Sequence, residues 1–347
     1  MLLNDSATVN AFLQNQASAY DPAFSHDVHV DIVNTIQRGT STLWMVDLKE
    51  GDLELPLVVK QRVQSGSAAG NPWRLASLPD VLEMTTHESR AYHHIEALFE
   101  QHAHPGIETV RVLDTLSEEE ILVMSRVPGV ELGQRIAQAH RLSNASCRDE
   151  VIQACSLAGE WLRVFHASSL EDQLAPDGDP LDLCGRIETL SVLPPHWANL
   201  RESISHPDVD TRTSVAHGDF WPGNVLATSE QITVLDTFAW ARTSVYVDLA
   251  YFLVHLRAMQ LQLYMGGLLH AESFLTLCEQ AFLRGYDPEV TLHHQTLTNM
   301  CLRVLLCKWG GYVEARDRVS GPKAIQKTLQ WHIRKRMLVA LFSRYSK

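Results

Sequence analysis

The first third of the chain alternates between patterns typical of strands and of a helix. Residues 43–50 and 54–63 are rich in β-branched and other apolar residues, and residues 50–52 supply turn chemistry between them. Residues 110–116 and 119–127 have the same character on either side of an acidic turn. These segments predict two pairs of strands.

Helical periodicity appears at two further places in this first third. Residues 1 to about 20 have the pattern of a short amphipathic helix. A second helix is predicted between the two pairs of strands, because five apolar residues recur with the spacing of one helix face. They are Ala91, Tyr92, Ile95, Leu98 and Phe99.

After Pro128 and Gly129 the pattern becomes mainly helical. A stripe with a period of 3.6 residues runs from Ala154 to Phe165. A strand-rich part followed by a helix-rich part is typical of an α+β protein. We therefore predict two lobes, an N-terminal lobe of residues 1–125 and a C-terminal lobe of residues 126–347, in a chain of 347 residues that is long enough for two domains.

Composition excludes several classes of protein. The formal net charge of −12 argues against nucleic-acid binding, which needs clustered Lys and Arg. The most apolar stretch, residues 247–265, is interrupted by polar residues and is too polar for a membrane-spanning helix. The six cysteines form no CxxC pair, so we expect reduced, mostly buried thiols and a cytoplasmic protein without an N-terminal secretory signal.

The most informative segment is residues 214–250. It contains His217-Gly218-Asp219, then Asn224, and then Asp236 at the end of an apolar run. If residues 224–227 and 231–236 form a hairpin, Asn224 and Asp236 are diagonal neighbours about 7–8 Å apart on one face. Their oxygen atoms are the hard donors that Mg²⁺ prefers.

Such a set of residues suits phosphoryl transfer. That reaction needs a positioned nucleophile and cations that neutralise the moving phosphoryl group, and it needs little covalent help from protein. An aspartate that accepts the proton of a substrate hydroxyl would serve as the base. The segment therefore predicts a kinase that uses ATP and Mg²⁺.

The run HGDFWPGNVL, followed by VLD and then DLA, resembles the aminoglycoside phosphotransferase / choline kinase-like superfamily. The resemblance implies a two-lobed protein-kinase-like fold. It also implies that Asp219 is the catalytic base, that Asn224 and Asp236 bind the metal, and that His217 and Asp248 support the catalytic loop. Asp248 also has the sequence position of an N-cap for the apolar helix that follows it.

A kinase of this kind needs a strand lysine for the ATP phosphates and a helix glutamate that holds the lysine. Lys60 ends an apolar strand, and Glu88 lies on the periodic helix 28 residues later. The alternatives are a solvated lysine on an edge strand and a capping box formed by Thr85 and Glu88 at the start of the helix. We favour the ion pair.

The other expected nucleotide contacts are weaker matches. Residues 37–42 have one glycine and several hydroxyls (Thr40, Ser41 and Thr42), and they either cradle phosphate or form an ordinary hairpin turn. The segment ILVMSRVPGVEL resembles the superfamily's hinge, whose backbone contacts adenine. This resemblance points to Ser125 and Val127.

The acceptor of the phosphoryl group is the open question. Residues 171–182 are acidic, which suits a cationic acceptor, whereas residues 323–347 hold seven of the 29 Lys and Arg and no acid. That basic segment suits an anionic acceptor, a membrane-surface contact through Trp331, Leu341 and Phe342, or a solvated helix face. The leading hypothesis is a kinase for a small hydroxyl compound such as a sugar, an amino alcohol or an aminoglycoside-like molecule. A kinase of a larger acceptor (a glycan, a lipid-linked group or a protein) and a nucleotide-binding pseudokinase are the alternatives.

Overall fold

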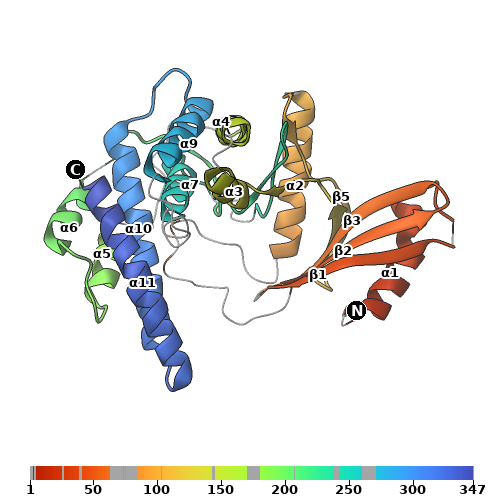
Figure 1. Ribbon diagram of the computed structural model, residues 1–347, viewed down its shortest axis with the longest axis horizontal. Coiled ribbons are helices and arrows are strands. Elements are labelled where there is room, and N and C mark those ends of the chain that lie inside the picture. The colour runs from red at the N-terminus through yellow and green to blue at the C-terminus, as the bar shows by residue number, and fades with distance from the viewer. Residues whose placement is uncertain are drawn as a thin grey trace. The chain divides into compact units, whose positions relative to one another are not determined.

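The computed structural model describes residues 3, 5–25, 27–38, 41–62, 73, 75, 84–102, 104–142, 145–169, 180–206, 208–237, 242–259 and 271–346 (Figure 1). The chain forms two compact units. Unit 1 contains Met1–Gly70, Pro79–Pro128 and Thr233–Phe238, and unit 2 contains Asn71–Leu78, Gly129–Ile232 and Ala239–Lys347. The predicted boundary after residue 125 differs from this division, because unit 1 also contains residues 233–238 and unit 2 also contains residues 71–78.

Unit 1 is built on an antiparallel sheet with the strand order β1-β2-β3-β6-β5. Its strands are β1 (His29–Gln37), β2 (Ser41–Glu50), β3 (Leu53–Arg62), β5 (Val112–Leu116) and β6 (Ile121–Ser125). A short strand β4 (Ile107–Glu108) precedes β5. The predicted turn between β2 and β3 is present, with Gly51 at φ 59°, a conformation that glycine adopts without steric cost.

The two faces of this sheet carry different apolar clusters. Helix α1 (Ser6–Tyr20) contributes Val9 and Leu13 to the cluster that contains Leu57 and Val59 of β3. Helix α2 (Met84–Gln101) contributes Tyr92 to the opposite cluster, against which Val58 packs. Because side chains alternate between the faces of a strand, Lys60 and Arg62 share the face of Val58 and α2.

Unit 2 is mainly helical. Its helices are α3 (Leu132–Leu142), α4 (Ala145–Ala167), α5 (Pro180–Glu188), α6 (Trp197–Ser205), α7 (Tyr246–Ala258), α9 (Ala271–Tyr286), α10 (His294–Asp317) and α11 (Pro322–Tyr345). The short strands β7 (Val130–Glu131) and β9 (Val225–Ala227) pair antiparallel, as do β8 (Thr213–Val215) and β11 (Arg242–Ser244). Strand β10 (Ile232–Val234) begins at the end of unit 2 and continues into unit 1.

Helices α4 and α9 approach each other closely at two glycines. A Cβ atom on Gly159 would lie 2.1 Å from the carbonyl oxygen of Phe282, and one on Gly285 would lie 2.0 Å from the carbonyl oxygen of Ser156. No real side chain fits such distances. Glycine at both positions therefore allows the two backbones to touch.

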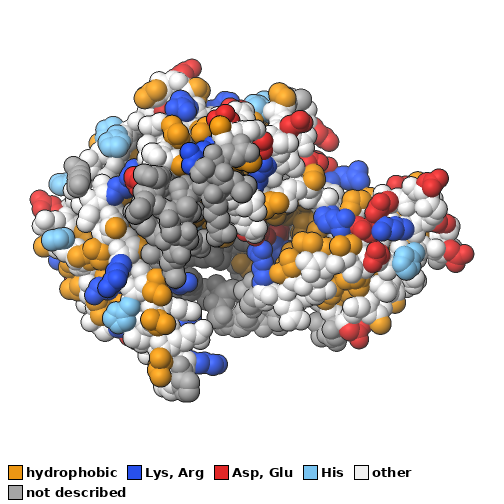
Figure 2. All heavy atoms as spheres, viewed as in Figure 1, with side chains coloured by type: hydrophobic (Ala, Val, Ile, Leu, Met, Phe, Trp, Pro, Cys, Tyr) orange, Lys and Arg blue, Asp and Glu red, His pale blue; other side chains and the backbone are white. Residues whose placement is uncertain are grey.

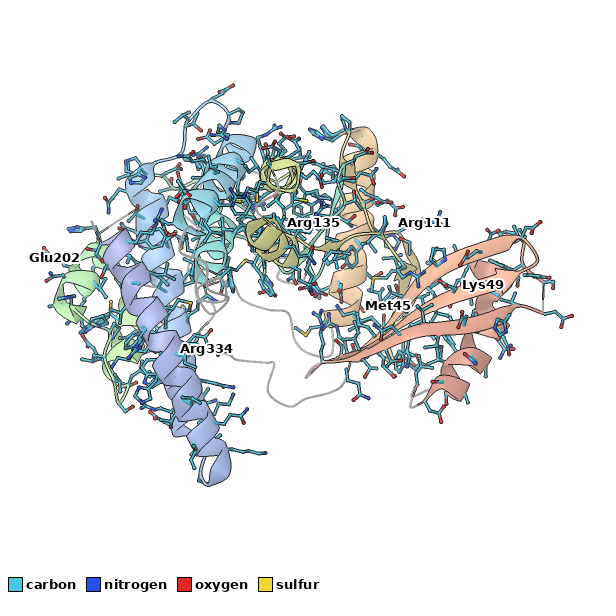
Figure 3. The ribbon with its side chains drawn as sticks, in the orientation of Figure 1. Met45, Lys49, Arg111, Arg135, Glu202 and Arg334 are labelled. Carbon is cyan, nitrogen blue, oxygen red and sulfur yellow. The ribbon has the colours of Figure 1, made fainter. Side chains whose placement is uncertain are left out.

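The C-terminal helix α11 bears on one of the three alternatives left open for the basic C-terminal segment, a membrane contact through three named side chains. Trp331, Leu341 and Phe342 are buried, and Trp331 packs edge-on against Trp309 of α10 with 4.8 Å between ring centroids. Three side chains that pack inside the protein cannot provide a membrane contact. Arg334, on the same helix (Figure 3), lies over the ring of Tyr312 at 4.4 Å.

The surface carries charges of both signs (Figure 2). No described helix is long and apolar enough to cross a membrane. In the view of Figure 2, acidic and basic side chains alternate over the outer end of the β1–β3 sheet. Lys49 of β2 (labelled in Figure 3) lies 3.5–3.6 Å from carboxylates of Asp31, Asp47 and Glu54. The pairs with Asp31 and Glu54 are exposed and contribute little stability, whereas Asp47 is buried.

All six cysteines are free thiols, as predicted from their spacing. Five of them are buried, and Cys147 is partly exposed. Burial in apolar surroundings raises the pKa of the Cys301 and Cys307 thiols, the latter to about 12. These thiols therefore stay protonated and behave as small core residues.

Candidate active site

Unit 1 contains an ion cluster around Lys60. The ammonium of Lys60 lies 2.7 Å from Oε1 of Glu88 and 2.6 Å from Oδ1 of Asp236. The side chains of Lys60 and Glu88 are 5% and 1% exposed, so this contact is screened little by water. The predicted pairing of Lys60 with Glu88 is therefore present.

Glu88 does not cap helix α2. Its Oε1 accepts from Lys60 and its Oε2 from Nη2 of Arg62. The hydroxyl of Thr85 donates to Glu120, outside the helix. Helix α2 is described from Met84 on, and Glu88 lies beyond the first turn from there, so Thr85 and Glu88 do not form a capping box.

Arg62 was not among the residues predicted from the sequence. It follows Lys60 by two positions on β3, and strand alternation turns both side chains toward α2. The alternation alone would have identified Arg62 as a second cation near Glu88.

Asp236 follows β10 and takes a left-handed backbone conformation with φ 59°, which is uncommon for a residue with a Cβ atom. Its backbone N–H donates to the hydroxyl of Tyr92 at 2.9 Å, and its second carboxylate oxygen lies 3.8 Å from Arg38. Burial alone would raise the pKa of Asp236, but the charges of Lys60, Arg38 and Arg62 and the hydrogen bond from Lys60 outweigh it and lower the pKa. Asp236 is therefore ionised at neutral pH.

The segment expected to cover phosphate is shorter than predicted. Ser41 and Thr42 belong to strand β2, where they pair with Arg62 and Gln61 of β3. The backbone N–H of Arg38 donates to the carbonyl of Ser41 at 2.8 Å, which closes the turn. Thr40 lies outside the described residues. Phosphate contacts by these hydroxyls stay a prediction.

The two residues predicted for the hinge lie at the end of strand β6 and just after it. Ser125 is the last residue of β6, and its backbone N–H donates to the carbonyl of Arg111 at 2.8 Å. Val127 packs against the apolar cluster that contains Tyr92 and Met124. The Ser125 amide hydrogen is thus already used within the sheet, and adenine binding by either residue stays a prediction.

Unit 2 contains the loop with His217, Gly218 and Asp219. Its backbone is held by Asp248, whose Oδ2 accepts from the N–H of His217 at 2.7 Å and whose Oδ1 accepts from the N–H of Gly218 at 2.9 Å. Gly218 has φ 80°, which glycine adopts readily. The carboxylate of Asp248 thereby determines the path of the chain that enters Asp219.

The sequence position of Asp248 suggested that it is the N-cap of α7, but it is not. The helix begins at Tyr246, and Asp248 lies in the first turn with its side chain directed at the loop. A carboxylate in the first turn is also favoured by the helix dipole. Burial alone would raise the pKa of Asp248, but the hydrogen bonds and charges of its partners, His166 first among them, lower it.

His166, near the end of α4, contacts Asp248 and was not predicted from the sequence. Its Nε2 lies 3.1 Å from Oδ2 of Asp248 and its Nδ1 lies 3.0 Å from the hydroxyl of Tyr286. Its carbonyl accepts from the hydroxyl of Ser214 at 2.9 Å. Nothing in the local pattern around residue 166 indicates these partners, which are 48 to 120 residues away.

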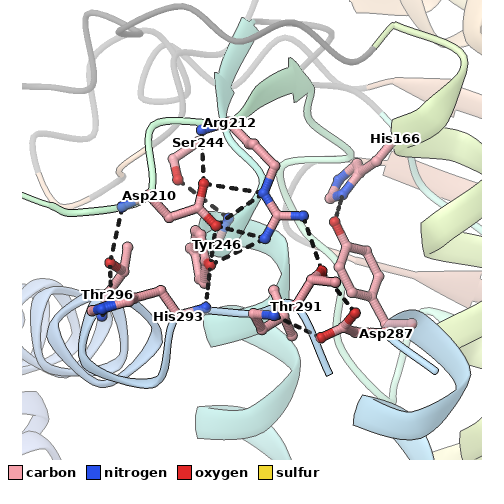
Figure 4. A network of polar contacts seen from close by, with 11 residues as sticks. His166, Asp210, Arg212, Ser244, Tyr246, Asp287, Thr291, His293 and Thr296 are labelled. Atoms are coloured by element: carbon pink, nitrogen blue, oxygen red, sulfur yellow. Dashed lines mark hydrogen bonds and ion pairs between the residues drawn. The ribbon is translucent and has the colours of Figure 1, made fainter. Parts of the chain in front are cut away.

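A polar network ties the start of α7 to its neighbours (Figure 4). Arg212 binds Asp210 through Nε and Nη2, and the hydroxyl of Tyr246 donates to Asp210. The same hydroxyl accepts from the backbone N–H of His293 at 2.8 Å, at the N-cap of α10. Because Tyr246 is the first residue of α7, this network also holds the helix that carries Asp248.

Asp219 and Asn224 contact each other directly. The amide nitrogen of Asn224 donates to the backbone carbonyl of Asp219 at 2.9 Å and to its Oδ2 at 3.1 Å. His217 is fully buried, and its Nδ1 accepts from the N–H of Asp219 at 3.3 Å. His217 therefore supports the backbone of Asp219 and does not face solvent. Asp219 itself is only partly buried.

The predicted hairpin is present in a shorter form. Strand β9 starts after Asn224, β10 ends before Asp236, and the N–H of Thr228 donates to the carbonyl of Gln231 at 2.9 Å in the turn. Asn224 belongs to unit 2 and Asp236 to unit 1. Their joint binding of one metal ion stays a prediction.

Among the described residues no three His, Cys, Asp or Glu side chains form a ready-made metal site. Mg²⁺ is commonly held by one or two carboxylates together with substrate phosphates. Asn224 and Asp236 supply an amide oxygen and a carboxylate, which are donors of the correct chemical type.

Solved structures similar to this chain provide an independent test of the fold. No protein-family model and no curated protein sequence matches it. A choline kinase from Cryptosporidium parvum has a TM-score of 0.54 and 10% identity, with 98% of this chain and 94% of that chain covered. A choline/ethanolamine kinase family protein from Mesorhizobium loti has a TM-score of 0.51 and 13% identity, with 97% of each chain covered.

An amicoumacin kinase with AMP-PNP and Ca²⁺ bound is similar to the same degree, with a TM-score of 0.50, 12% identity and 96% of each chain covered. This chain has the fold of these kinases. The α+β, protein-kinase-like fold predicted from the sequence is thus confirmed over nearly the whole chain. At such low identity the likeness establishes the fold and not the activity.

Proposed function

We propose that this protein is an ATP-dependent kinase that transfers the γ-phosphoryl group of ATP to a hydroxyl group of a small molecule. The observation that carries the proposal is the buried ion cluster of Lys60, Glu88 and Asp236 in unit 1. Lys60 is a cation placed by a strand and oriented by a helix glutamate, which is the arrangement needed to bind phosphates of a nucleotide. A purely structural role would not require a second, partly exposed carboxylate on the same ammonium.

The residues of unit 2 support the catalytic half of the proposal. Asp219 is partly exposed, and Asn224 fixes one of its carboxylate oxygens. We assign it the role of general base that accepts the proton of the acceptor hydroxyl. Asp248, His166 and His217 hold the backbone on which Asp219 depends.

Asn224 and Asp236 are the residues that would bind a divalent cation, for which Mg²⁺ is our assignment. The cation would neutralise charge on the β- and γ-phosphates. Lys60 would contact phosphate oxygens while Glu88 keeps its ammonium in place. Thr40, Ser41, Thr42, Ser125 and Val127 are proposed as further nucleotide contacts.

The test is ATP turnover by the full-length protein, measured as ADP release with and without Mg²⁺ and with a panel of hydroxyl compounds. We expect Mg²⁺-dependent ADP release that a low-molecular-weight hydroxyl compound stimulates. Stimulation by a glycan, a lipid-linked group or a protein alone would favour the larger-acceptor alternative. ATP binding without turnover under all conditions would indicate a pseudokinase and contradict the proposal.

A further inference from the structure

Three side chains from separate elements of unit 2 meet beside the catalytic loop. Trp221 follows Asp219 by two residues, His255 lies on α7, and Lys308 lies on α10. The rings of Trp221 and His255 are 5.2 Å apart between centroids, and Nζ of Lys308 is 2.7 Å from Nε2 of His255. Because two residues span at most about 7 Å of chain, this cluster lies close to the proposed base.

His255 is neutral, and its tautomer follows from its neighbours. Nδ1 lies 2.8 Å from the carbonyl oxygen of Tyr251, so Nδ1 carries the hydrogen. Nε2 then presents its lone pair to the ammonium of Lys308. Burial, with the charge of Lys308, lowers the pKa of His255 to about 3. The positive charge of this pair therefore resides on Lys308.

The three side chains are partly exposed, whereas the neighbours of Lys308 on α10 are not. Cys307 and Trp309 are 3% and 0% exposed. Lys308 is therefore a partly exposed cation in an otherwise buried stretch of α10. It lies next to the neutral imidazole of His255, which packs against the ring of Trp221, and it can still contact a bound molecule. The stretch therefore presents one charge at a defined place beside the catalytic loop.

Trp221 is held in its orientation by the loop itself. A Cβ atom on Gly223 would lie 2.2 Å from the indole ring, so only glycine leaves room for the ring there. The carbonyl of Pro222, the residue directly after Trp221, accepts a hydrogen bond from the N–H of Gly133 at 3.0 Å. The ring next to the base is thus part of a constrained loop.

This chemistry selects a class of ligand. An ammonium binds carboxylate, sulfate or phosphate groups through charge-assisted hydrogen bonds. The flat ring of Trp221 offers an apolar surface to the body of a small molecule. A polycationic or quaternary ammonium compound would meet the like charge of Lys308, which disfavours it.

We infer that Trp221, His255 and Lys308 form the acceptor site of the proposed kinase, and that the acceptor is a hydroxyl compound with an anionic group bound by Lys308. This inference rests on the proposed function for the reaction, but it predicts binding that can be measured without turnover. The anionic group would thus be bound by one residue beside the catalytic loop and not by the basic C-terminal segment.

The experiment compares acceptors that differ by one acidic group: serine with ethanolamine, glycerate with glycerol, and glucuronate with glucose. ADP release is measured with the full-length protein and Mg²⁺-ATP, and binding of each compound is measured by calorimetry. We expect the acidic member of at least one pair to bind about tenfold more tightly than its partner, because a charge-assisted contact is lost with the acidic group. Lys308→Met should abolish that preference, and Lys308→Arg should restore much of it. Lys327→Met, an exposed charge change on α11, is the matched control.

The outcomes separate the two claims. Turnover with neutral or cationic acceptors that Lys308→Met leaves unchanged would overturn the inference and leave the kinase proposal intact. Binding of acidic compounds that depends on Lys308, without turnover of any compound in the panel, would support the anion site and contradict the kinase proposal. If no acidic compound binds more tightly than its partner, the anion site is wrong.

Discussion

Lys60 and Asp236 form an ion pair with 2.6 Å between Nζ and Oδ1, although 176 residues separate them in the sequence. The same ammonium also contacts Glu88. Each carboxylate has a second cation, since Arg62 binds Glu88 and Arg38 lies 3.8 Å from Asp236. Removal of Lys60 therefore leaves neither carboxylate wholly uncompensated, which allows its functional role to be separated from its structural role.

We expect Lys60→Met to raise the KM for ATP by about tenfold or more, because a hydrogen bond from a charged group is worth about 1.5–3 kcal/mol. The measurement is ADP release over a range of ATP concentrations, with denaturant unfolding in parallel. Arg62→Met is the matched variant, since it removes a cation from the same carboxylate and leaves Lys60 in place. An equal rise in KM for both variants would contradict a specific role of Lys60 at the phosphates.

Asp219→Asn should lower kcat by about 10²–10⁴-fold, the usual loss on removal of a general base. The amide keeps an oxygen near Oδ2's position for Asn224, and the backbone carbonyl still accepts the second hydrogen bond. The loop should therefore keep its geometry, and the Kd for ATP should stay nearly constant. Single-turnover assays and calorimetry measure the two quantities.

Asp236→Ala provides the contrast to Asp219→Asn. It removes a proposed metal ligand, so ATP binding should lose its dependence on Mg²⁺. If Asp219→Asn turned over ATP normally, or if Asp236→Ala kept full Mg²⁺ dependence, the respective role would be wrong.

Acid should destabilise the fold through three aspartates. The pKa values of Asp210, Asp236 and Asp248 lie below the ordinary value in the folded protein. The unfolded chain therefore binds more protons than the folded chain below about pH 5, and stability falls as pH decreases toward and below about 4. The check is urea unfolding between pH 7 and pH 3.

Asp210→Asn is the control for this pH dependence, because it removes the carboxylate that binds Arg212 and Tyr246. Its unfolding free energy should be lower at pH 7 and should change less between pH 5 and pH 3. A free energy that stays constant or increases on acidification would contradict the assignment.

Much of the fold and part of the site could be predicted from local sequence. The spacing of Ala91 to Phe99 identified α2, and strand periodicity identified β2 and β3 with the turn between them. Lys60 and Glu88 could be paired because one lies on a strand and the other on a helix, and the spacing of apolar residues predicts the orientation of both elements. Asp219 and Asn224 are close in sequence, so their contact is local as well.

The rest depends on contacts that no local pattern encodes. The sequence position of Asp248 suggested an N-cap, but the helix starts two residues earlier. Only the family resemblance implied that Asp248 supports the catalytic loop, and its carboxylate accepts from the backbone of that loop 30 residues away. His166 and Tyr286 were missed because their partners come from other helices. A membrane-surface contact through Trp331, Leu341 and Phe342 was one of three alternatives for the basic C-terminal segment, and the sequence alone does not show that these side chains are buried.

Helix α4 approaches the backbone of α9 closely at Gly159. Gly159→Ala should lower the free energy of unfolding by about 1–3 kcal/mol, because the added methyl group overpacks a backbone contact. Gly185→Ala is the control, since an added Cβ there meets nothing within 4 Å in helix α5. That variant should be neutral or more stable by up to about 1 kcal/mol. Denaturant unfolding of both variants measures the difference.

Gly285→Ala extends this test to catalysis. Gly285 precedes Tyr286, whose hydroxyl contacts His166, and His166 in turn contacts Asp248 behind the catalytic loop. A displacement of α9 from α4 should therefore lower kcat more than it raises the KM for ATP, since the nucleotide contacts are proposed for unit 1. An Ala variant that lost stability but kept full kcat would show that the position of Asp219 does not depend on this helix contact.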